Sequence, residues 1–242
     1  MTEPTPPERS EISEAYWHLK ECSLFDCLSD EELGALSASV RLDILLRRQH
    51  LAYDDPGKEC VFFVKKGYLK LLRLLPDGQE VIIDLVGPGE FFGRIHARTT
   101  EHSHVREMAE ATETATVCVL RRTDFERHLA AAPHLSREVM ANLDDRVERI
   151  RERVVDLAFR SAPQRLAGFF DRYVENYGTQ QHNIRRAPLP LSQQEVGYLA
   201  GMSRQSVTTL MHTWREEQII DFDRQQITIV DRDRLQQIIQ GN

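Results

Sequence analysis

Two short helices in series, between residues 192 and 218, constrain this chain more than any other feature of its sequence. Ser192 and Glu195 form the capping-box pattern that starts the first helix, and Gly201 suits the left-handed position that ends it. The second helix, Ser203 to Gln218, carries apolar residues at helical spacing along one side only. Two helices joined this tightly are the helix-turn-helix layout, in which the second helix enters the major groove of DNA.

Polar side chains crowd the first turns of that second helix. Arg204 can donate two parallel hydrogen bonds to guanine, and Gln205 can bracket adenine. Hydroxyls at helix N-termini suit phosphate oxygens. A polar helix end that only faces water would not explain why a capped helix, a glycine turn and such an edge occur in series. We therefore predict a DNA-binding site made of Ser192, Gln193, Ser203, Arg204, Gln205, Ser206, Thr208 and Thr209.

The N-terminal half of the chain has a different sequence pattern. Between about Val40 and Leu120, short apolar runs alternate with turn residues, above all Pro76-Asp77-Gly78. Many short strands at near-regular spacing predict a small sandwich or barrel. Behind the second helix, QQITIVDRDRL indicates a hairpin strand and a short terminal helix, which makes the helix-turn-helix a winged one. We therefore expect the α+β fold class.

An apolar seam runs along the helix predicted from His134 to about Arg160. Its members follow one another in steps of three and four residues, and Arg and Glu fill the flanks, as in a parallel coiled coil. A single buried helix would show a similar stripe, but a wider and less charged one. We therefore predict a homodimer interface made of Met140, Leu143, Val147, Ile150, Val154 and Leu157.

Length and charge favour two folding units. The 242 residues carry a net charge of −7, but residues 160–242 hold 10 Lys and Arg against 9 Asp and Glu, so the acidic excess lies in the front part. An acidic whole can still carry a locally basic surface for DNA. We expect a flexible N-terminal segment (1–22), a sensor domain (23–132), a dimerisation helix (133–160) and a DNA-binding domain (161–242).

Several classes of protein are excluded by what the sequence lacks. No apolar run approaches the roughly 18 residues of a membrane helix, and the N-terminus lacks a signal-peptide pattern, so we expect a cytoplasmic protein without a membrane partner. We find no nucleophile elbow, no glycine-rich phosphate loop and no zinc-protease helix, so we expect no enzyme.

Two long stretches carry a family resemblance. EVGYLAGMSRQSVTTLMHTWREEQII resembles the DNA-binding helices of the Crp/Fnr superfamily of bacterial transcription regulators, and VFFVKKGYLKLLRLLPDGQEVIIDLVGPGEFFG resembles that family's cyclic-nucleotide-binding-like β-roll, a jelly roll. The similarity spans about residues 20–240, in the family's order. It implies a homodimer on a palindromic operator in double-stranded DNA, with RNA polymerase as a further partner. Gln205 and Thr209 replace the family's usual Glu and Arg. The DNA half-site should therefore differ from the family's usual one at the bases that these two residues contact.

The resemblance leaves the effector unknown. In cyclic-AMP-binding members, a Glu for the ribose follows the GPGEFFG stretch, but Arg94 stands there in this chain. Because this change reverses the charge that faces the ribose, we do not expect cyclic AMP to bind in the usual mode. The resemblance places a candidate effector pocket at Glu90, Gly93, Arg94, His96 and Arg106.

Four alternatives remain for the signal. An iron–sulfur sensor would use Cys22, Cys27, Cys60 and Cys118, of which Cys118 and Cys22 fall near ligand positions of the Fnr branch, but the closely spaced upstream cysteines of that branch are absent. A haem sensor would use His96, about one residue from that branch's ligand position. Another small metabolite would bind in the candidate effector pocket. A constitutive DNA-binding or interaction protein would need no ligand. Apart from these alternatives, the cysteines are typical of reduced thiols and no metal is expected.

Overall fold

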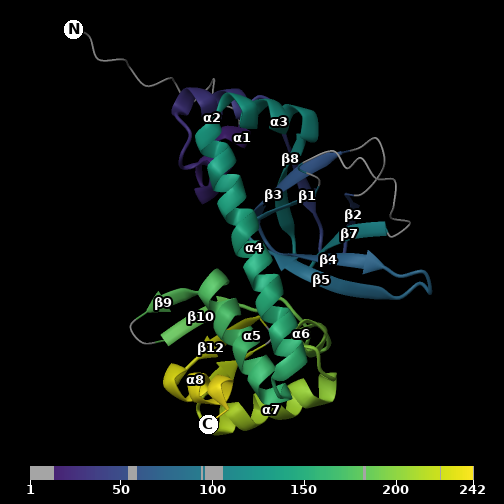
Figure 1. Ribbon diagram of the computed structural model, residues 1–242, viewed down its shortest axis with the longest axis vertical. Coiled ribbons are helices and arrows are strands. Elements are labelled where there is room, and N and C mark those ends of the chain that lie inside the picture. Colours follow the sequence, from purple (N-terminus) through teal and green to yellow (C-terminus); the bar gives the residue numbers. More distant parts are fainter. Residues whose placement is uncertain are drawn as a thin grey trace. The chain divides into compact units, whose positions relative to one another are not determined.

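The computed structural model describes residues 14–53, 59–93, 95, 106–181, 184–223 and 225–241. The chain divides into two compact units, which are Met1–Gln79 with Leu85–Leu143, and Glu80–Asp84 with Asp144–Asn242 (Figure 1). Within the described ranges, none of the helices combines the length and the apolar composition that crossing a bilayer would require.

The first unit is built on the predicted β-roll. The strands of the roll form two sheets, with the orders β1-β8-β3-β6 and β2-β7-β4-β5, and residues 80–84 of β5 group with the second unit. The turn predicted at Pro76–Gly78 follows β4, and Gly78 has a φ of 83° there. The strands are β1 (Val40–Leu45), β2 (His50–Ala52), β3 (Cys60–Lys66), β4 (Leu69–Leu74), β5 (Glu80–Val86), β6 (Phe91–Gly93), β7 (Arg106–Ala111) and β8 (Ala115–Arg121).

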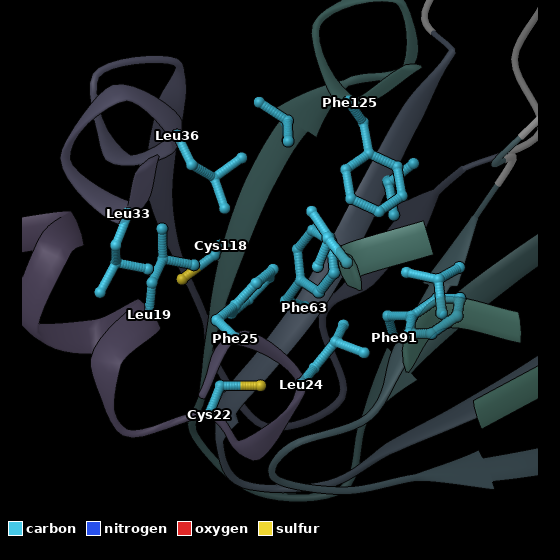
Figure 2. Close-up of a cluster of buried hydrophobic side chains, with 14 of the residues drawn as sticks. Leu19, Cys22, Leu24, Phe25, Leu33, Leu36, Phe63, Phe91, Cys118 and Phe125 are labelled. Carbon is cyan, nitrogen blue, oxygen red and sulfur yellow. The ribbon is translucent and has the colours of Figure 1, made fainter. Parts of the chain in front are cut away.

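One face of the first sheet carries the main apolar cluster of this unit (Figure 2). Alternate residues of β3, Val61 and Phe63, point to this face, and Phe63 meets Phe25 and Phe125 at ring-centroid distances of 5.0 and 5.4 Å. The cluster is completed by residues of α1 (Glu14–Lys20), the 3-10 helix η1 (Ser23–Phe25), α2 (Asp30–Ser37) and α3 (Arg122–Ala131). Burial of this apolar surface holds the helices on the sheet.

The N-terminal prediction is wrong from residue 14 onward. Residues 14–22 were expected to be flexible, but α1 packs Tyr16 and Leu19 into the apolar cluster, and Cys22 is also buried. Tyr16 donates a hydrogen bond to Asp30 Oδ1 at 2.6 Å, which ties α1 to α2. A seven-residue amphipathic helix carries too little periodicity to stand out beside a Pro-rich, acidic leader. Residues 1–13 of the expected flexible segment lie outside the described residues.

The long helix is α4, Pro133–Phe159, close to the predicted range. At 1.5 Å per residue its 27 residues extend about 40 Å. The boundary between the two compact units falls inside α4, after Leu143, and not at its first residue as the predicted domain limits had it.

The second unit is a winged helix-turn-helix. A four-stranded sheet in the order β11-β12-β10-β9 packs with the helices, and β11 and β12 form the hairpin that the sequence indicated. β9 and β10 extend this sheet. The elements are α5 (Ala162–Tyr177), β9 (Thr179–Gln181), β10 (Ile184–Pro188), α6 (Gln193–Ala200), α7 (Arg204–Glu216), β11 (Ile220–Phe222), β12 (Gln226–Ile229) and α8 (Arg232–Gln240). The expected α+β fold class is confirmed.

Candidate nucleic-acid interface

The turn between α6 and α7 has the geometry that the sequence predicted. Ser192 and Glu195 form a complete capping box at the start of α6, and Gly201 ends it with φ 66° and ψ 43°, in the left-handed region. Gly197 allows the turn to close, because a Cβ there would lie 2.7 Å from the carbonyl oxygen of Met202. Ser203 then caps α7 by accepting a hydrogen bond from the backbone N–H of Ser206 at 3.1 Å.

Arg165 of α5 fixes this turn in place, a role that the sequence analysis missed. Its Nε donates to the carbonyl of Ala200 at 3.0 Å and its Nη2 to that of Gly201 at 2.8 Å. Its Nη1 donates to the carbonyl of Arg160 at 2.8 Å, in the connection from α4 to α5. The last carbonyls of a helix lack hydrogen-bond partners within the helix. The Arg165 guanidinium supplies such partners at the end of α6 and links this end to the end of α4.

The leading edge of α7 is free to meet another molecule. Val207, Met211 and Trp214 are buried and hold the helix on its unit, whereas Arg204, Gln205 and Thr209 are exposed. Ser203 is exposed and Ser206 half-buried, and both serve the cap of α7. Exposed donors at the N-terminal end of the second helix are the arrangement that reads base edges in a major groove.

Thr208, one of the predicted DNA-binding residues, also contacts the preceding helix α6. Its hydroxyl donates to Oε1 of Gln193 at 2.6 Å and also lies 2.9 Å from the carbonyl oxygen of Arg204. The bond fixes the Gln193 amide and leaves its NH2 group as a donor at the start of α6. Thr208 thus positions a neighbouring DNA-binding candidate, and spacing along the sequence alone could not show this contact between two helices.

The predicted dimer seam is largely exposed in this single chain. Five of its six residues, Met140, Val147, Ile150, Val154 and Leu157, are between 45% and 61% exposed. Leu143 is half-buried instead, because it packs against the apolar cluster of the first unit. Leu157 also lies against the turn, since a Cβ on Gly201 would collide with its side chain.

Only part of the candidate effector pocket lies within the described residues. Arg94 and His96 lie outside them. Glu90 accepts a hydrogen bond from the backbone N–H of Gly87 at 2.9 Å, and Arg106 is exposed at the start of β7. Gly93 has a φ of 99°, and a Cβ there would collide with the carbonyl oxygen of Cys60. Glu90 and Gly93 therefore shape the turn before β6 and its pairing with β3.

The four cysteines do not fit an iron–sulfur cluster. Cys22 and Cys118 lie inside the apolar cluster (Figure 2) and Cys27 packs against it, whereas Cys60 belongs to the opposite face of the sheet, because strand residues alternate between faces. Burial and the neighbouring Cys22 raise the pKa of the Cys118 thiol to about 11, and burial also raises the pKa of Cys22. A cluster needs thiolates that converge on one point. The residue that a haem would need, His96, lies outside the described residues.

Comparisons with known proteins agree with this architecture. Residues 50–132 match the cyclic nucleotide-binding domain family, and residues 164–238 match the Crp-like helix-turn-helix domain family. A CRP-like cAMP-activated global transcriptional regulator of Mycobacterium tuberculosis is 23% identical over 90% of this chain and 96% of its own length. The transcriptional activator protein Anr of Pseudomonas protegens is 23% identical over 88% of this chain and 89% of its own.

Solved structures share the fold. FixK2 from Bradyrhizobium japonicum superposes with a TM-score of 0.69 at 20% identity, over 82% of this chain and 96% of its own. A CooA mutant from Carboxydothermus hydrogenoformans superposes with a TM-score of 0.67 at 20% identity, over 84% of this chain and 88% of its own. The two domain families occur in the order that the resemblance implied, and the relatives match along nearly the whole chain. The chain belongs to the Crp/Fnr superfamily of transcription regulators, with a cyclic-nucleotide-binding-type domain followed by a DNA-binding helix-turn-helix.

Proposed function

We propose that this regulator acts as a homodimer in the cytoplasm and recognises a palindromic DNA site through the leading edge of α7. The observation that carries the proposal is the exposed edge of Arg204, Gln205 and Thr209, held at a turn that Arg165 and Gly201 fix. Gln193 and the serines at the two helix starts, Ser192 and Ser203, would contact phosphate. RNA polymerase would be the further partner, and no enzymatic step is required.

The dimer follows from the exposed seam on α4. Monomeric proteins rarely leave a contiguous apolar stripe in water, and heptad spacing makes the stripe self-complementary. A two-fold dimer would present two copies of α7 to one face of DNA, one helical turn apart. Both half-sites of the operator would then have the same sequence in opposite orientation.

Selection from randomised double-stranded DNA tests this function. We expect the enriched sequences to be two-fold symmetric, with half-site centres about 34–36 Å apart, and one guanine of each half-site to be strongly preferred. Protein purified under oxidising, reducing and metal-free conditions should enrich the same sequences. If no sequence is enriched under any condition, the chain would be an interaction module rather than a reader of DNA.

The effector is proposed not to be cyclic AMP bound in the usual mode. The Mycobacterium tuberculosis relative is cAMP-activated by name, but here Arg94 replaces the Glu expected to face the ribose. The carboxylate of the nearby Glu90 already accepts a hydrogen bond from Gly87. The convergence that an iron–sulfur cluster needs is missing among the cysteines. Another small metabolite, or constitutive DNA binding without a ligand, accounts better for these residues.

Calorimetry checks this expectation. Titration with cyclic AMP should give no heat of binding at micromolar ligand, and affinity for the selected DNA should not change when cyclic AMP is added. The Mycobacterium tuberculosis relative, treated in the same way, is the positive control. Micromolar binding accompanied by a DNA response would overturn this part of the proposal.

A further inference from the structure

The exposed arc of α7 continues beyond the residues predicted to read bases. His212 lies seven residues after Gln205, which is close to two full turns, so the two side chains project from nearly the same line of the helix. Both are exposed, as is Arg215. The rise between Gln205 and His212 is about 10 Å. The helix thus presents polar groups along its whole outer side and not only at its N-terminal end.

His212 and Arg215 are held together on an aromatic ring of the wing. The guanidinium carbon of Arg215 lies 4.7 Å from the ring centroid of Phe222, a residue of β11. The ring of His212 meets the same phenyl ring edge-on, with centroids 5.6 Å apart and an interplanar angle of 74°. A guanidinium over an aromatic face is attracted by the negative face of the ring. Phe222 therefore favours an arrangement in which both side chains lie against its ring.

Hydrogen bonding settles which groups this pair presents. Nη2 of Arg215 lies 3.2 Å from Nδ1 of His212, and because a guanidinium has only donors, Nδ1 must accept. A neutral His212 then carries its proton on Nε2, which makes that nitrogen a donor. In the described part of the chain, Arg215 has no carboxylate partner. The pair consequently offers an unneutralised positive charge and several N–H donors, but no free acceptor.

We propose that His212 and Arg215, braced by Phe222, form a second anchor of the DNA interface that binds a phosphate of the DNA backbone. This inference rests on the proposed function. When the N-terminal end of a recognition helix meets base edges, residues two turns later lie near the rim of the groove, where the phosphates run. Clustered donors with a positive charge match phosphate oxygens, whereas base reading also calls for acceptors.

The test measures affinity and salt dependence on the selected operator. Arg215→Ala should weaken binding about tenfold and reduce the slope of log K against log salt by about 1, with the order of base preferences unchanged. His212→Ala should weaken binding less and change the slope less than Arg215→Ala, because the permanent charge of the pair is on the guanidinium. Phe222→Leu keeps an apolar side chain in the wing but removes the ring face, so it should reproduce part of the Arg215→Ala loss.

A matched control removes an arginine that is already engaged. Arg234, in the same unit, donates to the carbonyl of Glu217 at 2.8 Å and pairs with its carboxylate at 3.4 Å, so Arg234→Ala should leave the salt slope unchanged. Unchanged affinity and slope for Arg215→Ala, while Arg204→Ala still weakens binding, would overturn the second anchor alone. Altered base preference would show that the pair reads bases. No DNA binding by the unmodified protein would remove the proposed function itself.

Discussion

Replacing both Val147 and Ile150 with Asp is expected to convert the proposed dimer into monomers at micromolar concentration. Both side chains are exposed in the single chain, at 45% and 54%, so the substitutions should leave the fold of the chain intact. In a parallel dimer each new carboxylate would face its own copy across the seam, away from water. A buried charge without a partner costs about 3–5 kcal/mol, so two such substitutions should weaken association by several kcal/mol.

Light scattering or sedimentation measures this change, and circular dichroism checks that helix content is retained. Val155→Asp is the matched control, because Val155 lies on the same helix and is 49% exposed, but outside the three-four spacing of the seam. The control should stay dimeric. A dimer that survives Asp at both Val147 and Ile150 would show that the copies associate through another surface.

The seam on α4 shows which features the spacing of apolar residues can predict and which it cannot. Steps of three and four residues located the apolar stripe of α4, and five of its residues are exposed in the single chain. Periodicity cannot show which of its members also serve the chain's own packing. Leu143 is partly used by the apolar cluster of the first unit, and Leu157 lies against Gly201 of the turn. These contacts join residues distant in sequence, so no local pattern encodes them.

The helix-turn-helix was predictable because each of its signals is local. A capping box, a left-handed glycine and a serine cap all act within about four residues, and the structure has each of them where the sequence indicated. The groups that stabilise and extend the interface are not local. Arg165 reaches Gly201 across 36 positions, Thr208 reaches Gln193 across 15, and the pairing of Arg215 with Phe222 depends on how β11 returns beside α7.

In the N-terminal segment, the local sequence pattern led to a wrong prediction. A leader rich in Pro and acidic residues suggested flexibility through residue 22, whereas the buried side chains of Tyr16 and Leu19 belong to the apolar cluster of the roll. Helix propensity in seven residues is too weak to decide the outcome, and tertiary packing decides it instead. Two residues of the candidate effector pocket, Arg94 and His96, lie outside the described residues.

Arg204→Ala is expected to remove one base preference from each half-site of the operator. Arg204 is exposed, and in the described part of the chain its guanidinium has no hydrogen-bond or ion-pair partner, so it is available to a guanine. The cap of α7 is formed by Ser203 and should survive the substitution. A bidentate contact to guanine contributes about 1–3 kcal/mol of discrimination, so operator affinity should fall and preference at one symmetric base pair should flatten.

Gln193→Ala distinguishes base recognition from phosphate contact in the same experiment. The amide of Gln193 is fixed by Thr208 and is proposed to face phosphate, so its loss should weaken all sequences alike and keep the order of preference. The salt slope should change little, because Gln carries no charge. Selection on randomised half-sites with the unmodified protein and the two variants decides between these roles. If Arg204→Ala kept every base preference of the unmodified protein, the leading edge of α7 would contact DNA without reading its sequence.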